Sequence, residues 1–244
     1  MKILSKEMDS KSRKRDKKLK AKVQQSHMVK QQGSASQKLH SKMSESLKSS
    51  KFRFLNEQLY KSPSKDAAAM FKESPTLFDD YHEGYRNQVE KWPKNPLDLI
   101  VGELQKPKYR NADIGDFGCG EGKLELRLKA SGHQGQIFSF DVGKCAEHII
   151  QTDIASVPLE DASLDIGVFS LSLMGTNFPD FLVEANRVLK PGGTLFVAEV
   201  VSRFESVGAF VSHCREDAGF KPLKVTKLKD FFYMMIFTKK RSLG

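Results

Sequence analysis

The chain has 244 residues and a mass of 27.5 kDa, which suits one globular domain of ordinary size with an appended segment. It carries 40 Lys and Arg against 30 Asp and Glu, a formal charge of +10 at pH 7. No apolar run approaches the roughly 20 residues that a membrane-spanning helix needs, and the N-terminus lacks the apolar stretch of a signal peptide. Three cysteines without CxxC spacing exclude a disulfide framework and a zinc ribbon. We therefore expect a reduced, intracellular, soluble protein with no membrane partner and no bound metal.

The positive charge is concentrated at the N-terminus. Residues 1–53 carry 16 Lys and Arg against 4 Asp and Glu, whereas residues 54–244 carry 24 against 26. No aromatic residue precedes Phe52, so residues 1–50 cannot build a core, and we predict that they form a basic, disordered arm. Residues 11–22 alone hold eight cations, which favours contact with nucleic-acid phosphates, a nuclear import signal, or both. The alternative is a solvated polar tail without a partner.

A helical segment is predicted to follow this arm. Residues 31–50 are rich in Gln, Ser and Lys, as is typical of a linker, and apolar residues at helical spacing come next. A capping signal at Ser62–Asp66 precedes a short helix over Ala67–Phe71. We assign residues 51–105 to a helical N-terminal extension that packs on a core domain formed by residues 106–244.

Strands and helices alternate through the core domain. We predict strands at Asn111–Phe117, Gln136–Phe140, His148–Gln151, Leu164–Leu173, Thr194–Val201, Lys224–Leu228 and Phe232–Thr238. Helices are predicted at Glu121–Ala130, Phe178–Leu189 and Glu205–Ala218, and Lys190–Gly193 stop the second of them in a turn. This order indicates an α/β, Rossmann-like fold with a mostly parallel sheet, in which the closing hairpin supplies an antiparallel edge strand.

One connection departs from the regular pattern. Only eleven residues separate Asp141 from Asp153, fewer than a helical crossover between parallel strands usually needs. Either a loop replaces the second helix, or the third strand is rudimentary.

The strongest local signal is the glycine loop Asp116–Gly122 (DFGCGEG), which lies between a predicted strand and a predicted helix. Gly118 and Gly120 let the backbone approach a ligand closely, and the helix N-terminus presents free amides. About twenty residues later, Asp141 ends the next strand, where a carboxylate can accept hydrogen bonds from both ribose hydroxyls. The loop does not supply the G-x-G-x-x-G of dinucleotide enzymes. D-x-G-x-G-x-G is instead the pattern of S-adenosylmethionine (SAM) methyltransferases.

Three further residues fit such a cofactor. The leading Asp116 would help to hold the cationic methionine end. Asp153 follows a strand, and its carboxylate would bind the adenine amino group while Ile154 packs on the ring. Taken alone, Asp153 is more often a simple strand-end cap, but after the glycine loop and Asp141 the ligand role is favoured.

Five segments together resemble the ribosomal RNA-processing protein 8 family, also called nucleomethylin: Tyr81–Pro93, Asp116–Gly122, Val157–Asp161, Ser170–Asn177 (SLSLMGTN) and Glu184–Gly193. The resemblance covers residues 52–240. It implies a class I, SAM-dependent methyltransferase of the nucleolus, which forms N1-methyladenosine in large-subunit ribosomal RNA or its precursor and releases S-adenosylhomocysteine. Animal members are also linked to a nucleolar silencing complex that binds methylated histone tails.

The resemblance also implies a set of cofactor contacts: His82, Gly118, Asp141, Asp153, Ile154 and Ser170. Without it, His82 beside two tyrosines would be taken for a packed or surface residue. The missing second helix agrees with the family. The family usually has a different residue where this chain has Gly122, and we expect this departure to be harmless because it only frees the start of the helix.

The implied chemistry needs positioning more than acid–base catalysis. Adenine N1 exposes a lone pair at neutral pH, so no strong general base is required, but base pairing masks N1 and the base must be flipped or unpaired. No catalytic residue is assigned; candidates to line the base pocket are Ser172, Met174, Thr176 and Asn177. Asn177 either contacts the base edge or caps the helix that begins at Phe178. Cys119 and Cys214 are expected to pack, and no cysteine follows a proline as cytosine C5 transfer commonly requires.

Two alternatives stay open at this point. One is a SAM-binding adaptor of a chromatin-silencing assembly with little transfer activity, and the other is a small-molecule or protein methyltransferase. We expect a monomer in the nucleus and nucleolus with ribosomal RNA as its partner, and silencing proteins and a methylated histone tail as further partners.

Overall fold

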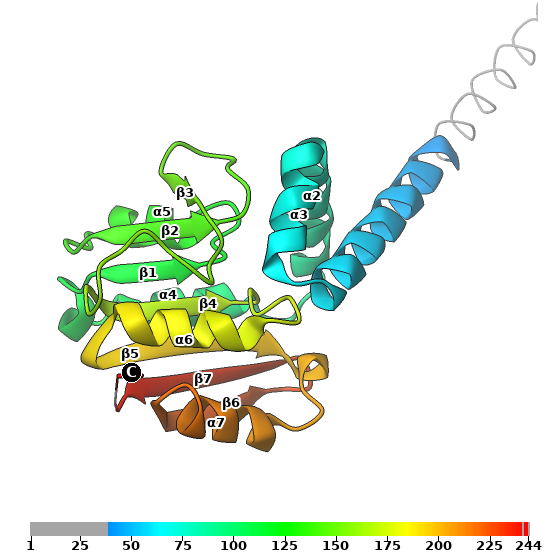
Figure 1. Ribbon diagram of the computed structural model, residues 1–244. Coiled ribbons are helices and arrows are strands. Elements are labelled where there is room, and N and C mark those ends of the chain that lie inside the picture. The colour runs from blue at the N-terminus through cyan, green and yellow to red at the C-terminus, as the bar shows by residue number, and fades with distance from the viewer. Residues whose placement is uncertain (1–38, 241, 244) are drawn as a thin grey trace, which may run out of the picture. The chain divides into compact units, whose positions relative to one another are not determined.

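A computed structural model of the chain describes residues 39–240 and 242–243 (Figure 1). The predictions for residues 1–38, including the basic run 11–22, lie outside these residues. Residues 39–50 are helical, so the predicted disorder and linker character are wrong for this stretch. An apolar residue recurs there at every fourth position, as Leu39, Met43 and Leu47, which is a helical spacing that the polar composition obscured.

Residues 51–244 form a separate unit built on one seven-stranded sheet. Its strands are β1 (Ile114–Phe117), β2 (Ile137–Asp141), β3 (Ile149–Gln151), β4 (Leu164–Ser170), β5 (Leu189–Val200), β6 (Phe220–Leu228) and β7 (Phe232–Lys239). The spatial order is β3-β2-β1-β4-β5-β7-β6, with β1 to β5 parallel and β7 antiparallel to both of its neighbours. The predicted sheet, with its antiparallel pairing at one edge, is therefore confirmed. The strand order reverses direction between β1 and β4, where open α/β sheets bind ligands.

Helices cover both faces of this sheet. The helices are α2 (Ser64–Glu73), α3 (Thr76–Val89), α4 (Pro96–Leu104), α5 (Lys123–Ala130), α6 (Phe178–Val188) and α7 (Val207–Glu216), with 3-10 turns η1 (Pro107–Tyr109) and η2 (Val201–Arg203). Helices α6 and α7 pack on one face, and α4 and α5 pack on the other (Figure 1). Each face has its own apolar core, which explains why β1 is buried along its whole length. Across the described ranges, none of the helices is long and apolar enough to cross a membrane.

The helices before the sheet have a third core of their own. Residues 51–61 are helical, and with α2 and α3 they bury an apolar cluster: Leu55, Leu59, Phe71, Phe78 and Tyr81. Gly84 of α3 faces Phe52, and a Cβ at Gly84 would lie 2.3 Å from the Cβ of Phe52. Helix α4 begins at a regular cap, where the Asn95 side chain accepts a hydrogen bond from the Leu97 amide and Pro96 occupies the first turn.

Two element boundaries differ from the prediction because of left-handed residues. Helix α5 begins at Lys123 rather than Glu121, because Gly122 has a φ of +66° and acts as its N-cap. A Cβ at Gly122 would also lie 2.2 Å from Nε2 of His148, so glycine at this position makes room for that ring. Strand β4 ends at Ser170 rather than Leu173, because Leu171 has a φ of +61°.

The segment Lys190–Gly193 is not a free turn but an irregularity inside β5. The α6 helix ends just before it, as predicted, but pairing with β4 then passes from Leu164↔Leu189 to Ile166↔Thr194. The four intervening residues bulge out of the ladder around Gly192.

The short β2–β3 connection satisfies both alternatives that the sequence left open. Residues 142–148 contain no helix, and β3 has only three residues. A loop therefore connects β2 to the edge strand β3, and no crossover helix covers the carboxyl end of β2.

Candidate functional site

A cleft opens at the carboxyl ends of β1, β2 and β4 and is walled by α2 and α3. It brings together nine residues that sequence analysis selected: His82, Asp116, Gly118, Gly120, Asp141, Ile154, Ser170, Ser172 and Met174. Asp153, Thr176 and Asn177 do not line it. The cleft thus joins segments separated by more than a hundred residues of sequence.

The glycine loop and the end of β2 are tied to each other directly. The Gly118 and Cys119 amides both donate to the carbonyl of Phe140, at 2.8 and 2.9 Å. One carboxylate oxygen of Asp141 accepts from the Gly120 amide at 2.8 Å, and the other accepts from the Gly143 amide at 3.3 Å. Burial raises the pKa of Asp141 to about 6, against the effect of these amides, so the group is ionised at pH 7.

Asp116, at the start of the glycine loop, is a second buried acid. Only 3% of its surface is exposed. Burial, with smaller effects from the charges of Asp141 and Glu125, raises its pKa to about 8. A cationic group near Asp116 would favour the ionised form and be attracted by it. The two acids give the floor of the cleft an affinity for positive charge.

Helix α3 lines the opposite wall with aromatic side chains. Phe78, Tyr81, His82 and Tyr85 all face the cleft. The His82 ring lies 4.3 Å from the Phe78 ring, centroid to centroid, and burial lowers its pKa to about 4, so it is neutral at pH 7. A Cβ at Gly120 would lie 3.0 Å from Cε1 of His82, so the glycine is required for the loop to pass under this ring.

The loop between β4 and α6 forms the remaining side of the cleft. Ser172 has a buried hydroxyl with no hydrogen-bond partner among the described residues, and it faces the cleft. Because buried polar groups are nearly always paired, this hydroxyl is suited to a ligand. The neighbouring Met174 accepts a hydrogen bond at its sulfur from the Tyr81 hydroxyl at 3.3 Å.

Ser64 joins two of the three predicted residues that lie outside the cleft lining, Asp153 and Asn177. Its hydroxyl donates to one oxygen of Asp153 at 2.7 Å, and the other oxygen accepts from the Ala155 amide at 3.0 Å. The Asn177 side chain accepts from the Ser64 amide at 2.9 Å and donates to the Ser64 hydroxyl at 3.0 Å. Asn177 occupies the N-cap position of α6 but makes no side-chain cap there.

The capping signal predicted at Ser62–Asp66 does not provide a side-chain cap for α2. Pro63 occupies the N-cap position and has no side-chain acceptor, and the Ser64 hydroxyl bonds Asp153 instead. Thr176 is held by its backbone, whose amide donates to the carbonyl of Ser62 at 3.1 Å. Sequence reasoning missed Ser64, whose partners are 89 and 113 residues away and leave no local pattern.

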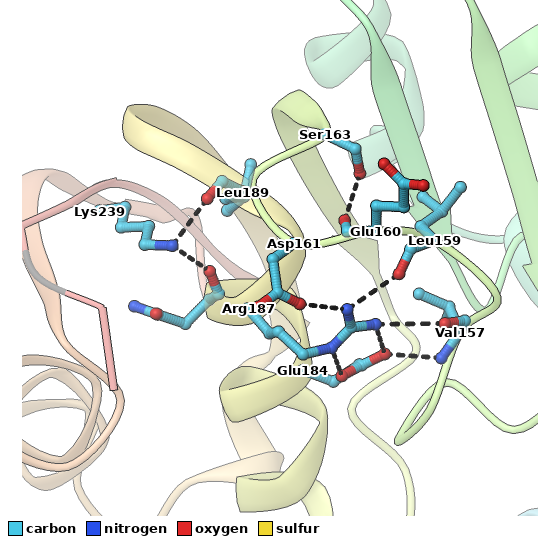
Figure 2. Close-up of polar contacts among 10 residues, drawn as sticks. Val157, Leu159, Glu160, Asp161, Ser163, Glu184, Arg187, Leu189 and Lys239 are labelled. Atoms are coloured by element: carbon cyan, nitrogen blue, oxygen red, sulfur yellow. Dashed lines mark hydrogen bonds and ion pairs between the residues drawn. The ribbon is translucent and has the colours of Figure 1, made fainter. Parts of the chain in front are cut away.

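Side chains of α6 hold the loop after Ile154 by hydrogen bonds (Figure 2). The guanidinium of Arg187 forms a two-pronged pair with Glu184, at 2.8 and 2.7 Å. It also donates to the carbonyls of Leu159 and Val157, at 2.8 and 3.2 Å, and to Asp161 at 2.7 Å. Glu184 accepts the Val157 amide at 2.7 Å. This cluster holds the apolar wall that carries Ile154.

The described residues offer neither a metal cluster nor an activated thiol. No group of three or more His, Cys, Asp or Glu side chains in the described part of the chain could hold a metal ion. Burial raises the pKa of Cys119 far above its ordinary range and that of Cys214 to about 12. Both cysteines therefore pack as thiols, as expected.

A family model described as a hypothetical methyltransferase matches residues 38–244. The chain belongs to this methyltransferase family. Ribosomal RNA-processing protein 8 of Dictyostelium discoideum is 47% identical over 201 residues, 82% of the chain and 50% of that protein. The 25S rRNA (adenine(645)-N(1))-methyltransferase of Schizosaccharomyces pombe is 43% identical, over 82% of the chain and 65% of that protein.

These relatives confirm the resemblance drawn from the sequence motifs. The chain spans about half the length of the curated relatives it matches. A third relative, the corresponding Saccharomyces cerevisiae 25S rRNA methyltransferase, is 37% identical over 83% of the chain and 56% of that protein.

Solved structures show the fold class of the chain. A Burkholderia thailandensis 1,6-didemethyltoxoflavin-N1-methyltransferase, solved with its substrate and S-adenosylhomocysteine, matches 70% of the chain and 90% of its own, with a TM-score of 0.53 and 14% identity. The [4+2]-cyclase SpnF matches 74% of the chain and 97% of its own, with a TM-score of 0.56 and 19% identity. The fold is that of class I SAM methyltransferases, as predicted. Because a cyclase shares it, the fold alone does not define the reaction.

Proposed function

We propose that the chain is a SAM-dependent methyltransferase that forms N1-methyladenosine in large-subunit ribosomal RNA. The observation that carries the proposal is the junction of the glycine loop with Asp141 at the head of an acidic, aromatic-walled cleft. The names of two relatives, both 25S rRNA (adenine(645)-N(1))-methyltransferases, support the RNA substrate and the position on adenine.

The cleft fits the cofactor on its own chemistry. The ligand combines a positive charge with an apolar adenosine, and the cleft combines the acids Asp116 and Asp141 with apolar and aromatic walls. Ser172, whose hydroxyl is unpaired among the described residues, lies beside Gly118: a Cβ added at Gly118 would lie 2.4 Å from the Ser172 Cβ. A polar ligand lying across the glycine loop would satisfy this hydroxyl.

Each cofactor contact inferred from the motifs has a place in this scheme. Asp141 would hold the ribose, and Ile154 would pack on the adenine. Gly118 and Gly120 would let the ligand lie close to the backbone of the glycine loop. Asp153 does not line the cleft itself, but it precedes Ile154, which does, and its oxygens keep lone pairs beyond those that Ser64 and Ala155 use. Binding of the adenine amino group by Asp153 would therefore require the ligand to reach past Ile154. His82 and Ser170 would contact the methionine part of the cofactor.

The cofactor would supply a methyl group on a sulfonium, and the protein would position the acceptor. Ser172 and Met174 line the cleft together with the rings of Tyr81 and Tyr85, and the Tyr81 hydroxyl donates a hydrogen bond to the Met174 sulfur. These rings can stack with an unpaired adenine. Burial raises the pKa of both tyrosines above their ordinary range, so their hydroxyls stay neutral. No residue has to remove a proton from N1, because its lone pair is already free.

The proposal extends to the arm and to the location of the protein. We propose that residues 11–22 bind RNA phosphates and direct the protein to the nucleus and nucleolus, where ribosomal RNA is made. A silencing assembly with methylated histone tails would be a second set of partners. The adaptor alternative predicts that Asp141 variants lose methylation and keep silencing.

Mass spectrometry of ribosomal RNA nucleosides tests the proposal. The purified chain, SAM and unmethylated large-subunit RNA should yield N1-methyladenosine, and Asp141→Asn should lower the yield when SAM is below saturation. RNA affinity should fall steeply with salt. A small-molecule or protein methyltransferase would give no methylated adenosine and no salt-dependent RNA binding, and either result would reject the RNA substrate.

A further inference from the structure

The peptide of Leu173, in the middle of the β4–α6 loop, is held from both sides by residues that do not line the cleft. Glu199, near the end of β5, accepts a hydrogen bond from the Leu173 amide at 2.9 Å. Arg203, in η2, donates to the Leu173 carbonyl at 3.0 Å and to the Gly175 carbonyl at 3.2 Å. The backbone amide and the backbone carbonyl of Leu173 are thus each bound by a side chain, one from β5 and one from η2, the turn that follows β5.

The loop needs such support because its backbone is strained. Leu171 has a φ of +61°, which an L-residue with a bulky side chain rarely adopts, and Gly175 has a φ of +103°. Residues in sparsely populated backbone conformations persist only where the surrounding structure determines them fully. Between these two positions lie Ser172 and Leu173, so the grip on Leu173 fixes the segment that carries the unpaired Ser172 hydroxyl.

Both holding residues are themselves rigidly placed. Glu199 has no exposed surface, and its second oxygen accepts the Val200 amide at 3.3 Å. The Arg203 guanidinium lies over the Tyr60 ring at 5.2 Å and over the Phe178 ring at 4.8 Å. Tyr60 belongs to the helix that precedes α2, and Phe178 begins α6, so Arg203 also connects the loop to the elements on either side.

We propose that Glu199 and Arg203 are positioning residues for the target base, acting by fixing the conformation of loop 171–177. The inference rests on the proposed function. Neither residue lines the cleft, so neither is expected to touch the base or the cofactor. Their effect would pass through Ser172 and Met174, which do line it.

The chain contains a matched control on the cofactor side. Glu184 is also a buried carboxylate, 7% exposed, and it also accepts one loop amide, that of Val157 at 2.7 Å. It supports the loop after Ile154 rather than the loop after β4. Two buried carboxylates therefore have the same local task in two different loops, each of which contributes residues to the cleft.

The test compares Glu199→Ala, Glu199→Gln and Glu184→Ala with the wild-type chain. Single-turnover methyl transfer is measured at saturating SAM and large-subunit RNA, and the Kd of S-adenosylhomocysteine is measured by calorimetry. Glu199→Ala should slow transfer by about 100-fold, since a displacement of about 1 Å at a reacting centre has such an effect. Its Kd should stay within about a factor of three of wild type.

The two other variants supply the contrast. Glu199→Gln keeps an oxygen that can accept the Leu173 amide and should recover most of the rate. Glu184→Ala should weaken S-adenosylhomocysteine binding by about tenfold or more. Hydrogen exchange of the 171–177 amides should speed up in Glu199→Ala and not in Glu184→Ala, which a general loss of stability would not produce.

Several results would overturn the inference. These are a wild-type transfer rate in Glu199→Ala, a parallel loss of rate and cofactor affinity, or no recovery in Glu199→Gln. If Glu199→Ala does not fold, Arg203→Lys decides, since lysine keeps the charge but lacks the separate Nε and Nη2 donors with which Arg203 reaches the two carbonyls. An unchanged rate rejects the inference. If the wild-type chain forms no N1-methyladenosine, the proposed function fails and the inference with it. An active wild type with an equally active Glu199→Ala rejects the inference alone.

Discussion

The Asp141 carboxylate accepts a hydrogen bond from the Gly120 amide at 2.8 Å, which joins the end of β2 to the loop after β1. Its other oxygen accepts from the Gly143 amide, so the group is held in one orientation before any ligand arrives. A carboxylate fixed in this way loses little conformational freedom when it binds a ribose. The ligand-binding acid and the glycine loop therefore form one preorganised element.

Asp141→Asn should weaken binding of S-adenosylhomocysteine about 10- to 100-fold. The new NH2 group would face either the Gly120 amide or the Gly143 amide, both of which donate to Asp141. Hydrogen bonds to a charged group contribute about 1.5–3 kcal/mol. Calorimetry measures the effect. Asp217→Asn, at an exposed helix end, is the control and should bind like wild type. Equal affinity in the Asp141 variant would remove the ribose role.

Asp116 should make the cofactor-free chain less stable as the pH rises from 7 to 9. Its pKa is about 8 in the folded chain and near 3.8 when unfolded, so the folded state keeps a proton that the unfolded state has lost. The associated stability is complete below the unfolded pKa and disappears as the pH rises through about 8. Asp141 and Glu199, with pKa values of about 6 and 7, act in the same direction at lower pH.

Melting temperatures at pH 7 to 9 check this expectation. Asp116→Asn should flatten the decline, whereas Asp217→Asn should keep it. SAM should also reduce the decline, because its positive charge stabilises the ionised Asp116. An unchanged slope in Asp116→Asn would show that Asp116 is not the group that titrates.

The parts of the site that the sequence predicted are those encoded by short, ordered patterns. Asp116, Gly118 and Asp141 lie at the carboxyl ends of strands that alternate with helices, so their order along the chain places them at one edge of the sheet. Helix α3 has no such pattern in the sequence. Its N-cap residue is Pro75, which offers no side-chain acceptor, and Gly84 in its middle is unfavourable for a helix. Its aromatic wall was therefore predicted only through the resemblance, as His82.

The contacts that the sequence did not predict are long-range side-chain contacts. Ser64 contacts Asp153 and Asn177 across 89 and 113 residues, and Glu199 contacts Leu173 across 26. None of these pairs has a characteristic spacing, because the fold and not the local chain brings them together. Asn177 shows the consequence, since local rules predicted a helix cap or a base contact, whereas its side chain bonds Ser64.

Arg187→Lys should lower both stability and cofactor affinity. Lysine keeps the positive charge but cannot make the paired contacts with Glu184 together with those to the carbonyls of Leu159 and Val157. We expect a loss of about 1–2 kcal/mol in the free energy of unfolding, because the buried Glu184 would lose part of its pairing while Arg187 itself is 35% exposed. The Kd of S-adenosylhomocysteine should rise several-fold, because the freed loop carries Ile154.

Urea unfolding and calorimetry measure the two effects of Arg187→Lys. Arg215→Lys is the control, since Arg215 is exposed and pairs only with its neighbour Glu216 among the contacts that the structure gives it. A loss of stability with unchanged cofactor affinity would show that the Arg187 cluster supports the fold but not the adenine wall.

Gly84→Ala and Gly102→Ala should change stability in opposite directions, although both glycines lie within helices. Alanine at Gly102 of α4 would meet nothing within 4 Å and should stabilise the chain by up to about 1 kcal/mol. Alanine at Gly84 of α3 would place its Cβ 2.3 Å from the Phe52 Cβ, an atom too close to the backbone to rotate away. The helix over residues 51–61 would have to move off α3, at an expected cost of about 1–3 kcal/mol. Urea unfolding of both variants isolates the clash from helix propensity, and equal stabilities would mean that Phe52 does not pack against α3 in solution.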